Sequence, residues 1–510
     1  MLTSTSLVSS IRRPSRDTAA ADAIPILVDN EYHLFHLTTP PSTVHHPERL
    51  RSSWSHLRSK CLTQWQRNEE FALSPGKSPQ SPDADGVWTG SAITGPDGNM
   101  HIFYTGYNLS ENGKQVIIHA TSEDRLGSRF TKSADPINIT SDSSNRAAFE
   151  DIDFRDPYVL YNEEEKLYWM ILGTRLASGS HWTRGCLALL TSKDLQAWTL
   201  EPDPFYAPND MMCPECPELF SLPNGKWYLV YSRFTTPNAG IVYRVADSPR
   251  GPFRTPRDGS GGRLDGRRWY AAKSCPKAHD LSRRIFFGWI ADQCVEDGKW
   301  SWGGDMAMPR EVRAKEDGSL VISPVEATLD HVFSALPSFD IPKIELEAIG
   351  GTMTKILDKV KCERPYMITF DVVSSSAASF GLVFDVDSDL KGCYLRFVPT
   401  FNGRCTVSLA MAPAPLDDFW ADQYQLYLPR AVDGPEIVKH ENVEANKTVT
   451  ILRSGDTLEV FVGGRSLSYR ILASDAASRK GNGVVRDVGV FVEDGIVQYS
   501  DFRVTEGMDY

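Results

Sequence analysis

The chain has 510 residues, a length that predicts two or three compact domains. Its 41% hydrophobic and 24% charged residues are typical of a globular protein and exclude a disordered chain. The 66 Asp and Glu residues exceed the 54 Lys and Arg residues, giving a net charge of -12. Because no basic run is present, nucleic acid is excluded as an expected partner.

The N-terminal segment carries no targeting signal that we recognise. Residues 1–18 lack the apolar core of a secretory signal, and we interpret them as an N-terminal tail. No apolar stretch approaches the roughly 20 residues that span a bilayer, so no membrane partner is expected. Nine scattered cysteines favour reduced thiols over a disulfide framework. These observations predict a cytoplasmic protein, with non-classical secretion left open.

Five short aromatic and apolar segments recur along the first 335 residues. They are YHLFHL from Tyr32, MHIFYT from Met100, LYWMIL from Leu167, WYLVYS from Trp227 and RIFFGW from Arg284. Their starts are 68, 67, 60 and 57 residues apart, and each follows a turn-forming or charged cluster. A strand-rich unit that repeats in this way is typical of β-propeller blades. We therefore predict a five-bladed propeller over residues 19–335, with a pair of β-sandwiches as the alternative.

The pattern changes after the fifth repeat. Residues 336–350 contain two prolines and are predicted to be a linker. Short alternating segments such as TLEVFVGG follow, separated by Gly, Asn and Asp turns. They predict an antiparallel β-sandwich over residues 351–510, so the expected fold class is all-β. A homo-oligomer assembled through this sandwich is left open.

The repeat selects three of the 66 carboxylates. The innermost strand of each blade lines the central channel of a propeller, so we examined the residues about ten positions before each repeated segment. Asp22, Asp156 and Glu215 lie there in three repeats, the region of Gly90 and Ser91 in another, and Lys273 in the fifth. Any one of these carboxylates alone is more simply interpreted as a solvated turn residue. Three carboxylates at equivalent positions of the repeat instead favour a functional site.

Glycosidic bond cleavage needs such a group of carboxylates. One carboxyl group donates a proton to the leaving oxygen, and a second attacks the sugar or activates water. Crowded carboxylates also raise the proton affinity of one member, which then stays protonated near neutral pH. The predicted partner is therefore a small carbohydrate.

Several sequence blocks resemble those of glycoside hydrolase family 32, the β-fructofuranosidases, invertases, inulinases and levanases. The blocks are YHLF from Tyr32, WSHLRSKCLTQW from Trp54, WTGSA from Trp88, FYTG from Phe103, FRDP from Phe154, ECPELF from Glu215 and MPRE from Met308. They occur in the family's order. The resemblance implies a five-bladed propeller with a trailing β-sandwich and cleavage of sucrose or fructooligosaccharides with retention of configuration.

Carried over residue by residue, the resemblance also implies roles. Asp22 would be the nucleophile, Asp156 the transition-state stabiliser and Glu215 the general acid/base. Retention predicts that the carboxyl groups of Asp22 and Glu215 lie about 5–5.5 Å apart. The residues expected to bind substrate are Arg155, Trp54, Trp88, Thr89, Ser91, Cys216 and Trp289. For the three tryptophans, a role in packing the blades is left open.

The sequence departs from the family pattern beside the expected nucleophile. The family's first block reads Asn-Asp-Pro-Asn-Gly, whereas Asp22 lies in AADAIP, and Leu37 occupies the position of a substrate-binding Gln. The chain is therefore interpreted as a divergent member.

A CPEC motif runs from Cys213 to Cys216. It lacks the further ligands of a zinc site and the βαβ context of a redox pair, so no metal or other cofactor is expected.

Two other functions are carried as alternatives. One is an inverting glycosidase of the family 43 type, acting on arabinose or xylose, which also has five blades and three acidic residues. The other is a sugar-binding protein without catalysis, which the altered first block suggests.

Overall fold

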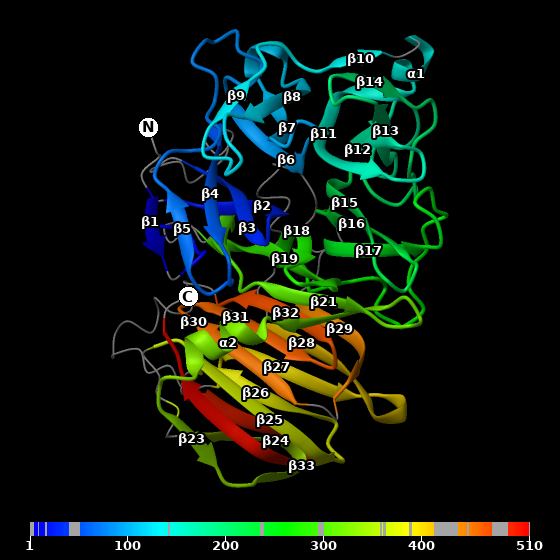
Figure 1. Cartoon of the computed structure of the whole chain (residues 1–510). Coiled ribbons are helices and arrows are strands. Elements are labelled where there is room, and N and C mark those ends of the chain that lie inside the picture. Colours follow the sequence, from blue (N-terminus) through cyan, green and yellow to red (C-terminus); the bar gives the residue numbers. More distant parts are fainter. Residues whose placement is uncertain are drawn as a thin grey trace.

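In the computed structural model, the chain folds into two β-domains, with the N-terminal domain above the C-terminal domain in Figure 1. It describes residues 5–8, 10–15, 18–39, 51–140, 143–234, 239–293, 300–357, 360, 364–386, 390–412, 437–445, 448–471 and 488–508. Helices are few and short, namely α1 (Ser143–Ala147) and α2 (Glu326–Phe333) with the 3-10 turns η2 (Leu109–Glu111) and η3 (Phe401–Gly403). Among the described residues, no helix has the length and hydrophobicity of a membrane span.

The first domain is a five-bladed β-propeller, as predicted. In the described residues, the first blade consists of β2 (Ala20–Val28), β3 (Glu31–Thr38), β4 (Ser53–Ser59) and β5 (Trp65–Asn68), and the second of β6 (Gly86–Thr94), β7 (Met100–Tyr107), β8 (Gln115–Ser122) and β9 (Phe130–Lys132). The third blade consists of β11 (Phe149–Asn162), β12 (Leu167–Leu176), β13 (Gly185–Ser192) and β14 (Ala197–Leu200), with β10 (Asn138–Thr140) as its outer strand. The fourth consists of β15 (Glu215–Ser221), β16 (Trp227–Arg233) and β17 (Gly240–Ala246), and the fifth of β18 (Trp269–Lys277), β19 (Asp280–Gln293), β21 (Arg310–Ala314) and β22 (Leu320–Pro324). The repeated aromatic segments form the second strand of each blade, and the five strands that precede them surround the centre.

The ring of blades is closed by an additional strand. β20 (Trp300–Met306) pairs with β19 of the last blade and, through Gly304 and Ala20, with β2 of the first. One hydrogen-bonded sheet therefore runs from the last blade into the first, which fixes β2 beside β18 and β19.

The two predicted segments outside the domains differ from the structure. Within the expected tail, β1 (Thr5–Val8) pairs with β5 as an outer strand of the first blade. The expected linker holds β23 (Ser338–Ile341) and the first part of β24 (Ile344–Ile356), which both pair with the last strand of the sandwich. Pro337 and Pro342 lie just outside these strands, where a missing N–H breaks no ladder bond. Helix α2 comes between the last propeller strand and the sandwich instead.

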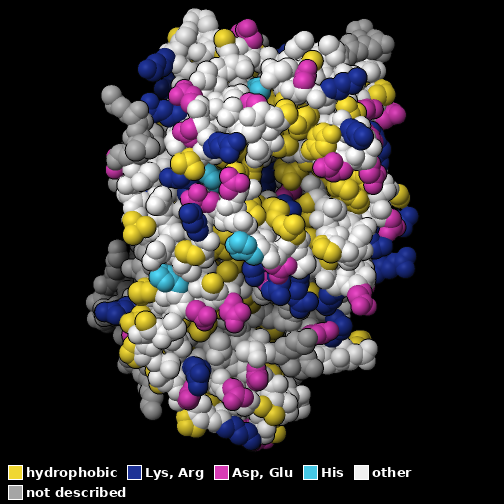
Figure 2. Space-filling model, viewed as in Figure 1, with side chains coloured by type: hydrophobic (Ala, Val, Ile, Leu, Met, Phe, Trp, Pro, Cys, Tyr) yellow, Lys and Arg dark blue, Asp and Glu magenta, His cyan; other side chains and the backbone are white. Residues whose placement is uncertain are grey.

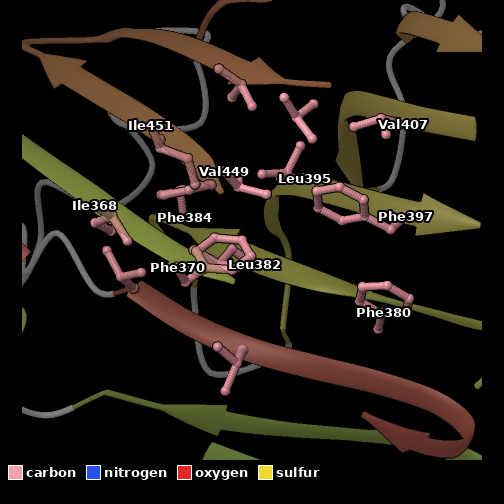
Figure 3. Close-up of a cluster of buried hydrophobic side chains, with 14 of the residues drawn as sticks. Ile368, Phe370, Phe380, Leu382, Phe384, Leu395, Phe397, Val407, Val449 and Ile451 are labelled. Carbon is pink, nitrogen blue, oxygen red and sulfur yellow. The ribbon is translucent and has the colours of Figure 1, made fainter. Parts of the chain in front are cut away.

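The second domain is a β-sandwich, as predicted. Besides β23 and β24, its described strands are β25 (Tyr366–Ser375), β26 (Ser379–Phe384), β27 (Gly392–Pro399), β28 (Arg404–Ala412), β29 (Ile437–Glu444), β30 (Val449–Ser454), β31 (Thr457–Val462), β32 (Arg465–Arg470) and β33 (Val488–Glu506). β33 pairs first with β26 and then with β25, so it joins the two layers. Figure 3 shows their inward side chains, among them Phe370, Leu395 and Ile451, meeting in one core.

Buried arginines hold the two domains together. Arg310 of β21 is fully buried and donates to Asp265 of the propeller at 2.5 Å and to Glu459 of the sandwich at 3.0 Å. Arg470 of β32 reaches back to Asp305 of β20 at 2.7 Å. Because an unpaired buried charge is costly, these ion pairs fix the orientation of the sandwich against the propeller.

The outer surface carries charges of both signs. Charged side chains of both signs are scattered over the face shown in Figure 2, with a group of Lys and Arg side chains near the middle of the molecule and hydrophobic side chains gathered around the centre of the propeller.

Candidate active site

A cavity of about 310 Å³ lies at the centre of the propeller, and it brings the three predicted carboxylates together. Asp22 comes from β2, Asp156 from β11 and Glu215 from the start of β15. The position on the repeat therefore selected residues that share one cavity. The predicted separation of the Asp22 and Glu215 carboxyl groups stays a prediction.

A β-bulge at the level of the cavity aims these side chains. The strand register shifts between Ala21 and Ala23 in β2, between Arg155 and Tyr158 in β11, and between Glu215 and Glu218 in β15. Corresponding shifts occur in β6 and β18, so each of the five innermost strands is irregular there. Bulges re-aim side chains and are common beside active sites. The bulges thus direct side chains of the inner strands into one cluster at the cavity.

Three of these bulges hold a residue in a left-handed backbone conformation, namely Asp156, Cys216 and Ala271. Asp156 has φ 58° and Cys216 has φ 50°, values that non-glycine residues adopt at some cost in energy. Their strain is offset by mutual contact, because the Cys216 amide donates to the Asp156 carboxylate at 2.8 Å. The Asp156 amide in turn donates to the Thr105 hydroxyl at 2.8 Å.

The Asp22 carboxylate accepts hydrogen bonds from Thr89 and Trp289. The Thr89 hydroxyl donates to one carboxylate oxygen, and the Trp289 indole N–H donates to the other at 2.9 Å. Burial raises the pKa of Asp22, and these two hydrogen bonds oppose that rise because they stabilise the ionised form. Fixed in this way, the carboxylate is suited to attack an electrophilic carbon.

Glu215 is placed between a cation and a phenol. Arg155 donates to its Oε1 at 3.0 Å, and the Tyr270 hydroxyl donates to its Oε2 at 2.6 Å. Burial raises the pKa of Glu215; Arg155 opposes this rise and the charge of Asp156 adds to it. A buried carboxyl group with a raised pKa is suited to donate a proton near neutral pH.

Asp156 is likewise buried, and burial raises its pKa. Arg155, the Cys216 amide and Lys273 all act against that rise. Lys273 occupies the position in the fifth blade that the carboxylates occupy in three of the others. Its ammonium group donates to the Gly90 carbonyl at 2.7 Å.

Of the seven predicted substrate-binding residues, five line the cavity. They are Trp88, Thr89, Arg155, Cys216 and Trp289. The Trp88 ring is partly exposed and stacks on Tyr107 with a centroid distance of 4.3 Å. It therefore offers an aromatic wall to a sugar.

The other two residues lie behind the cavity wall, contrary to prediction. Trp54 is fully buried in the core between the first two blades, where its indole N–H donates to the Trp88 carbonyl at 3.1 Å. The Ser91 hydroxyl accepts from the Val159 amide at 2.9 Å and so links the second blade to the third. Both side chains support the wall from outside.

Several cavity residues were missed by sequence reasoning. They include Tyr107, Gln115, Asp153, Met212, Phe234, Tyr270 and Trp302. Tyr270 and Asp153 had a signal in the sequence, since each lies on an inner strand three residues before a residue that the repeat selected, Lys273 and Asp156. The others come from outer strands, the closing strand β20 and the segments between strands, whose direction the repeat does not define.

Leu37 lies on the cavity wall beside Asp22, through the pairing of Leu37 with Ala21. Together with Phe234 and Trp302 it makes this part of the wall apolar.

The two cysteines of the CPEC motif have different surroundings. The Cys216 thiol faces Asp22 at 3.9 Å, whereas the Cys213 thiol faces the Thr174 carbonyl at 3.7 Å. Burial raises the pKa of both thiols well above their usual value. The seven cysteines that the structure describes are all free.

A propeller with three carboxylates in its central cavity defines a glycosidase-like site, and comparison with known proteins identifies the family. The model of the N-terminal domain of glycosyl hydrolases family 32 matches residues 23–324, more than half of the chain. The chain therefore belongs to glycoside hydrolase family 32, as the sequence blocks predicted, and the family 43 alternative is not supported.

Curated relatives agree with this family. A relative named β-fructofuranosidase, insoluble isoenzyme 1, from Oryza sativa subsp. indica is 27% identical over 368 residues, covering 66% of this chain and 56% of the relative. A levanase from Bacillus sp. (strain L7) is 29% identical over 332 residues, covering 59% and 33%. The chain thus spans about half the length of the first of these relatives and a third of the second.

Solved structures share the whole fold. Fructan 1-exohydrolase IIa from Cichorium intybus in complex with 1-kestose superposes with a TM-score of 0.72 at 17% identity, over 98% of both chains. Sucrose-6-phosphate hydrolase from Lactobacillus gasseri superposes with a TM-score of 0.68 at 17% identity, over 98% of this chain and 92% of that one. Both likenesses extend through the propeller and the sandwich.

Proposed function

We propose that this chain is a retaining β-fructofuranosidase that hydrolyses sucrose or short fructooligosaccharides and transfers fructosyl units to sugar acceptors at high substrate concentration. The observation that carries the proposal is the meeting of Asp22, Asp156 and Glu215 in one buried cavity. Membership of family 32 and relatives named β-fructofuranosidase and levanase support the same substrate class.

In the first step, Asp22 attacks the anomeric carbon of the fructosyl unit. A bond forms between its carboxylate oxygen and that carbon, and the glycosidic bond breaks with both electrons going to the leaving oxygen. Glu215 transfers its proton to that oxygen, which leaves Glu215 ionised. The hydrogen bonds from Thr89 and Trp289 favour this step because they stabilise the ionised form of Asp22 and orient it.

In the second step, Glu215 acts as a base. It removes a proton from water or from a sugar hydroxyl, whose oxygen then attacks the anomeric carbon and releases Asp22. Two displacements restore the original configuration. Asp156, held by the Cys216 amide, faces the same space and can stabilise the positive charge of the sugar in both transition states.

Separate incubation with sucrose, inulin and levan tests the proposal. We expect fructose release from at least one of them, with the ratio of fructose to glucose identifying the preferred substrate. The D22N variant should lose this activity while unfolding at the temperature of the wild type. Binding of all three sugars without turnover would instead support the non-catalytic alternative, and a D22N variant that still cleaves sucrose would disprove the role of Asp22.

A further inference from the structure

A chain of alternating charges runs from the outer part of the third blade to Glu215. Arg155 contacts Glu215 with one guanidinium nitrogen at 3.0 Å and Asp153 with another at 2.6 Å. The second carboxylate oxygen of Asp153 pairs with Arg175 at 2.8 Å, and Arg175 also pairs with Glu150. All these side chains are at least four-fifths buried, so solvent screens them only weakly.

Arg155 alone would work against an acid at Glu215. A guanidinium group beside a carboxyl group favours its ionised form, whereas the first step of the proposed mechanism needs that group protonated. Asp153 contacts the other terminal nitrogen of the same guanidinium and carries the opposing charge. Burial works to raise the pKa of Asp153, but Arg155 and Arg175 hold it below its usual value, so Asp153 stays ionised.

Gln115 completes the contacts that fix Arg155. Its side-chain amide donates to Asp153 at 3.3 Å, and its oxygen accepts from the Phe154 amide at 3.2 Å and from Arg155 at 3.4 Å. Asp153 and Gln115 therefore orient the Arg155 guanidinium through one terminal nitrogen, while the other terminal nitrogen donates to Glu215.

We propose that Asp153 is a positioning residue for the acid/base, which fixes the Arg155 guanidinium against Glu215 and offsets its positive charge. This proposal rests on the proposed function, in which Glu215 donates the proton. Asp153 acts through Arg155, which contacts both carboxylates. Its removal should therefore change the protonation of Glu215 before it changes the affinity for sugar.

Other charged groups also face this part of the cavity, and they remain in place in the test. Those that face Glu215 are Asp22 of β2, Arg155 and Asp156 of β11, Tyr270 of β18, and Cys213 and Cys216 on either side of Glu215, with Lys273 of β18 facing Asp156 and Cys216. β6 contributes Thr89, which does not titrate.

The experiment is the pH dependence of kcat/KM for sucrose, or for whichever fructan is cleaved. Activity falls on the basic side as Glu215 loses its proton, so a lower pKa of Glu215 moves this basic limb to lower pH. In D153N the Arg155 charge is no longer offset, and we expect the limb to move down by about one pH unit. D153E keeps the charge and should restore most of the wild-type profile.

Two further variants separate this effect from structural damage. D151N removes a carboxylate from the same strand, but Asp151 is 70% exposed and pairs with Lys114 outside the cavity. Its profile should match the wild type. R175Q removes the cation on the far side of Asp153, so the basic limb should move the opposite way, to higher pH.

An unchanged basic limb in a folded D153N variant would overturn the role of Asp153 and leave the proposed function standing. Shifts in the same direction in D153N and R175Q would also overturn it, because disruption of the strand would then explain both. Absence of any fructoside cleavage by the wild type is a different result, which would refute the proposed function itself.

Discussion

The hydrogen bond from Thr89 to Asp22 makes the most quantitative prediction about the nucleophile. The T89V variant keeps the volume and β-branching of the side chain and removes the hydroxyl that donates to the buried carboxylate. A hydrogen bond to a charged group contributes about 1.5–3 kcal/mol. Since one pKa unit corresponds to about 1.4 kcal/mol, its loss should raise the pKa of Asp22 by about one to two units. Trp289 still donates to the other oxygen, so the lower value is the more realistic.

The expected change lies on the acidic side of the pH profile. Asp22 must be ionised to attack, so activity is lost as the pH falls through its pKa, and a higher pKa moves this acidic limb to higher pH. Stopped assays of kcat/KM for sucrose between pH 3 and pH 8 would measure the shift. A Thr-to-Val change at Thr191 of β13, away from the cavity, is the matched control. An acidic limb that stays in place in T89V would refute the assignment of Thr89 as a donor to the nucleophile.

Acid should destabilise the fold, because His33 and His119 are buried and burial lowers their pKa to about 4 from an ordinary value of 6.5. Each neutral histidine contributes fully to the free energy of unfolding above about pH 6.5, and the fold loses on the order of 1–3 kcal/mol per histidine as the pH falls towards 4. Urea unfolding at several pH values measures this loss. An unfolding free energy that stays constant over this range would contradict the prediction. R310M removes the cation that pairs with both Asp265 and Glu459 in the interface between the domains and should lower the unfolding free energy by about 3–5 kcal/mol. An unchanged midpoint in urea would show that these ion pairs are dispensable. W88A removes the aromatic wall and should lower kcat/KM for sucrose about tenfold through KM, so an unchanged KM would place the sugar elsewhere.

The architecture could be predicted because the propeller repeats itself. Five similar segments at nearly even spacing identify the second strand of each blade, and the preceding strand then has to line the channel. Asp22, Asp156 and Glu215 were found in this way, although their offsets from the repeated segments drift from ten to twelve residues. The bulges in the inner strands do not follow from the spacing, and they decide which residue of each strand faces the cavity.

Residues set by tertiary packing could not be predicted. Trp54 and Trp88 belong to similar aromatic blocks, yet one is enclosed between two blades and the other is partly exposed, since the direction of a single ring depends on its neighbours. Asp153 directly precedes the FRDP block, but its pairing with Arg175 of the next strand depends on packing that the sequence does not show. The linker was wrong for a simpler reason: its two prolines flank β23 and do not interrupt it.

In the proposed mechanism Asp22 forms a covalent bond to the fructosyl unit, and trapping this intermediate is a direct test of that bond. The E215A variant should react with β-fructosyl fluoride, whose leaving group needs no acid, and should then release the fructosyl unit slowly because the base is missing. Peptide mass spectrometry of the quenched reaction should find one fructosyl group on the peptide that contains Asp22. A label on another carboxylate, or no label together with release of α-fructose, would contradict the account.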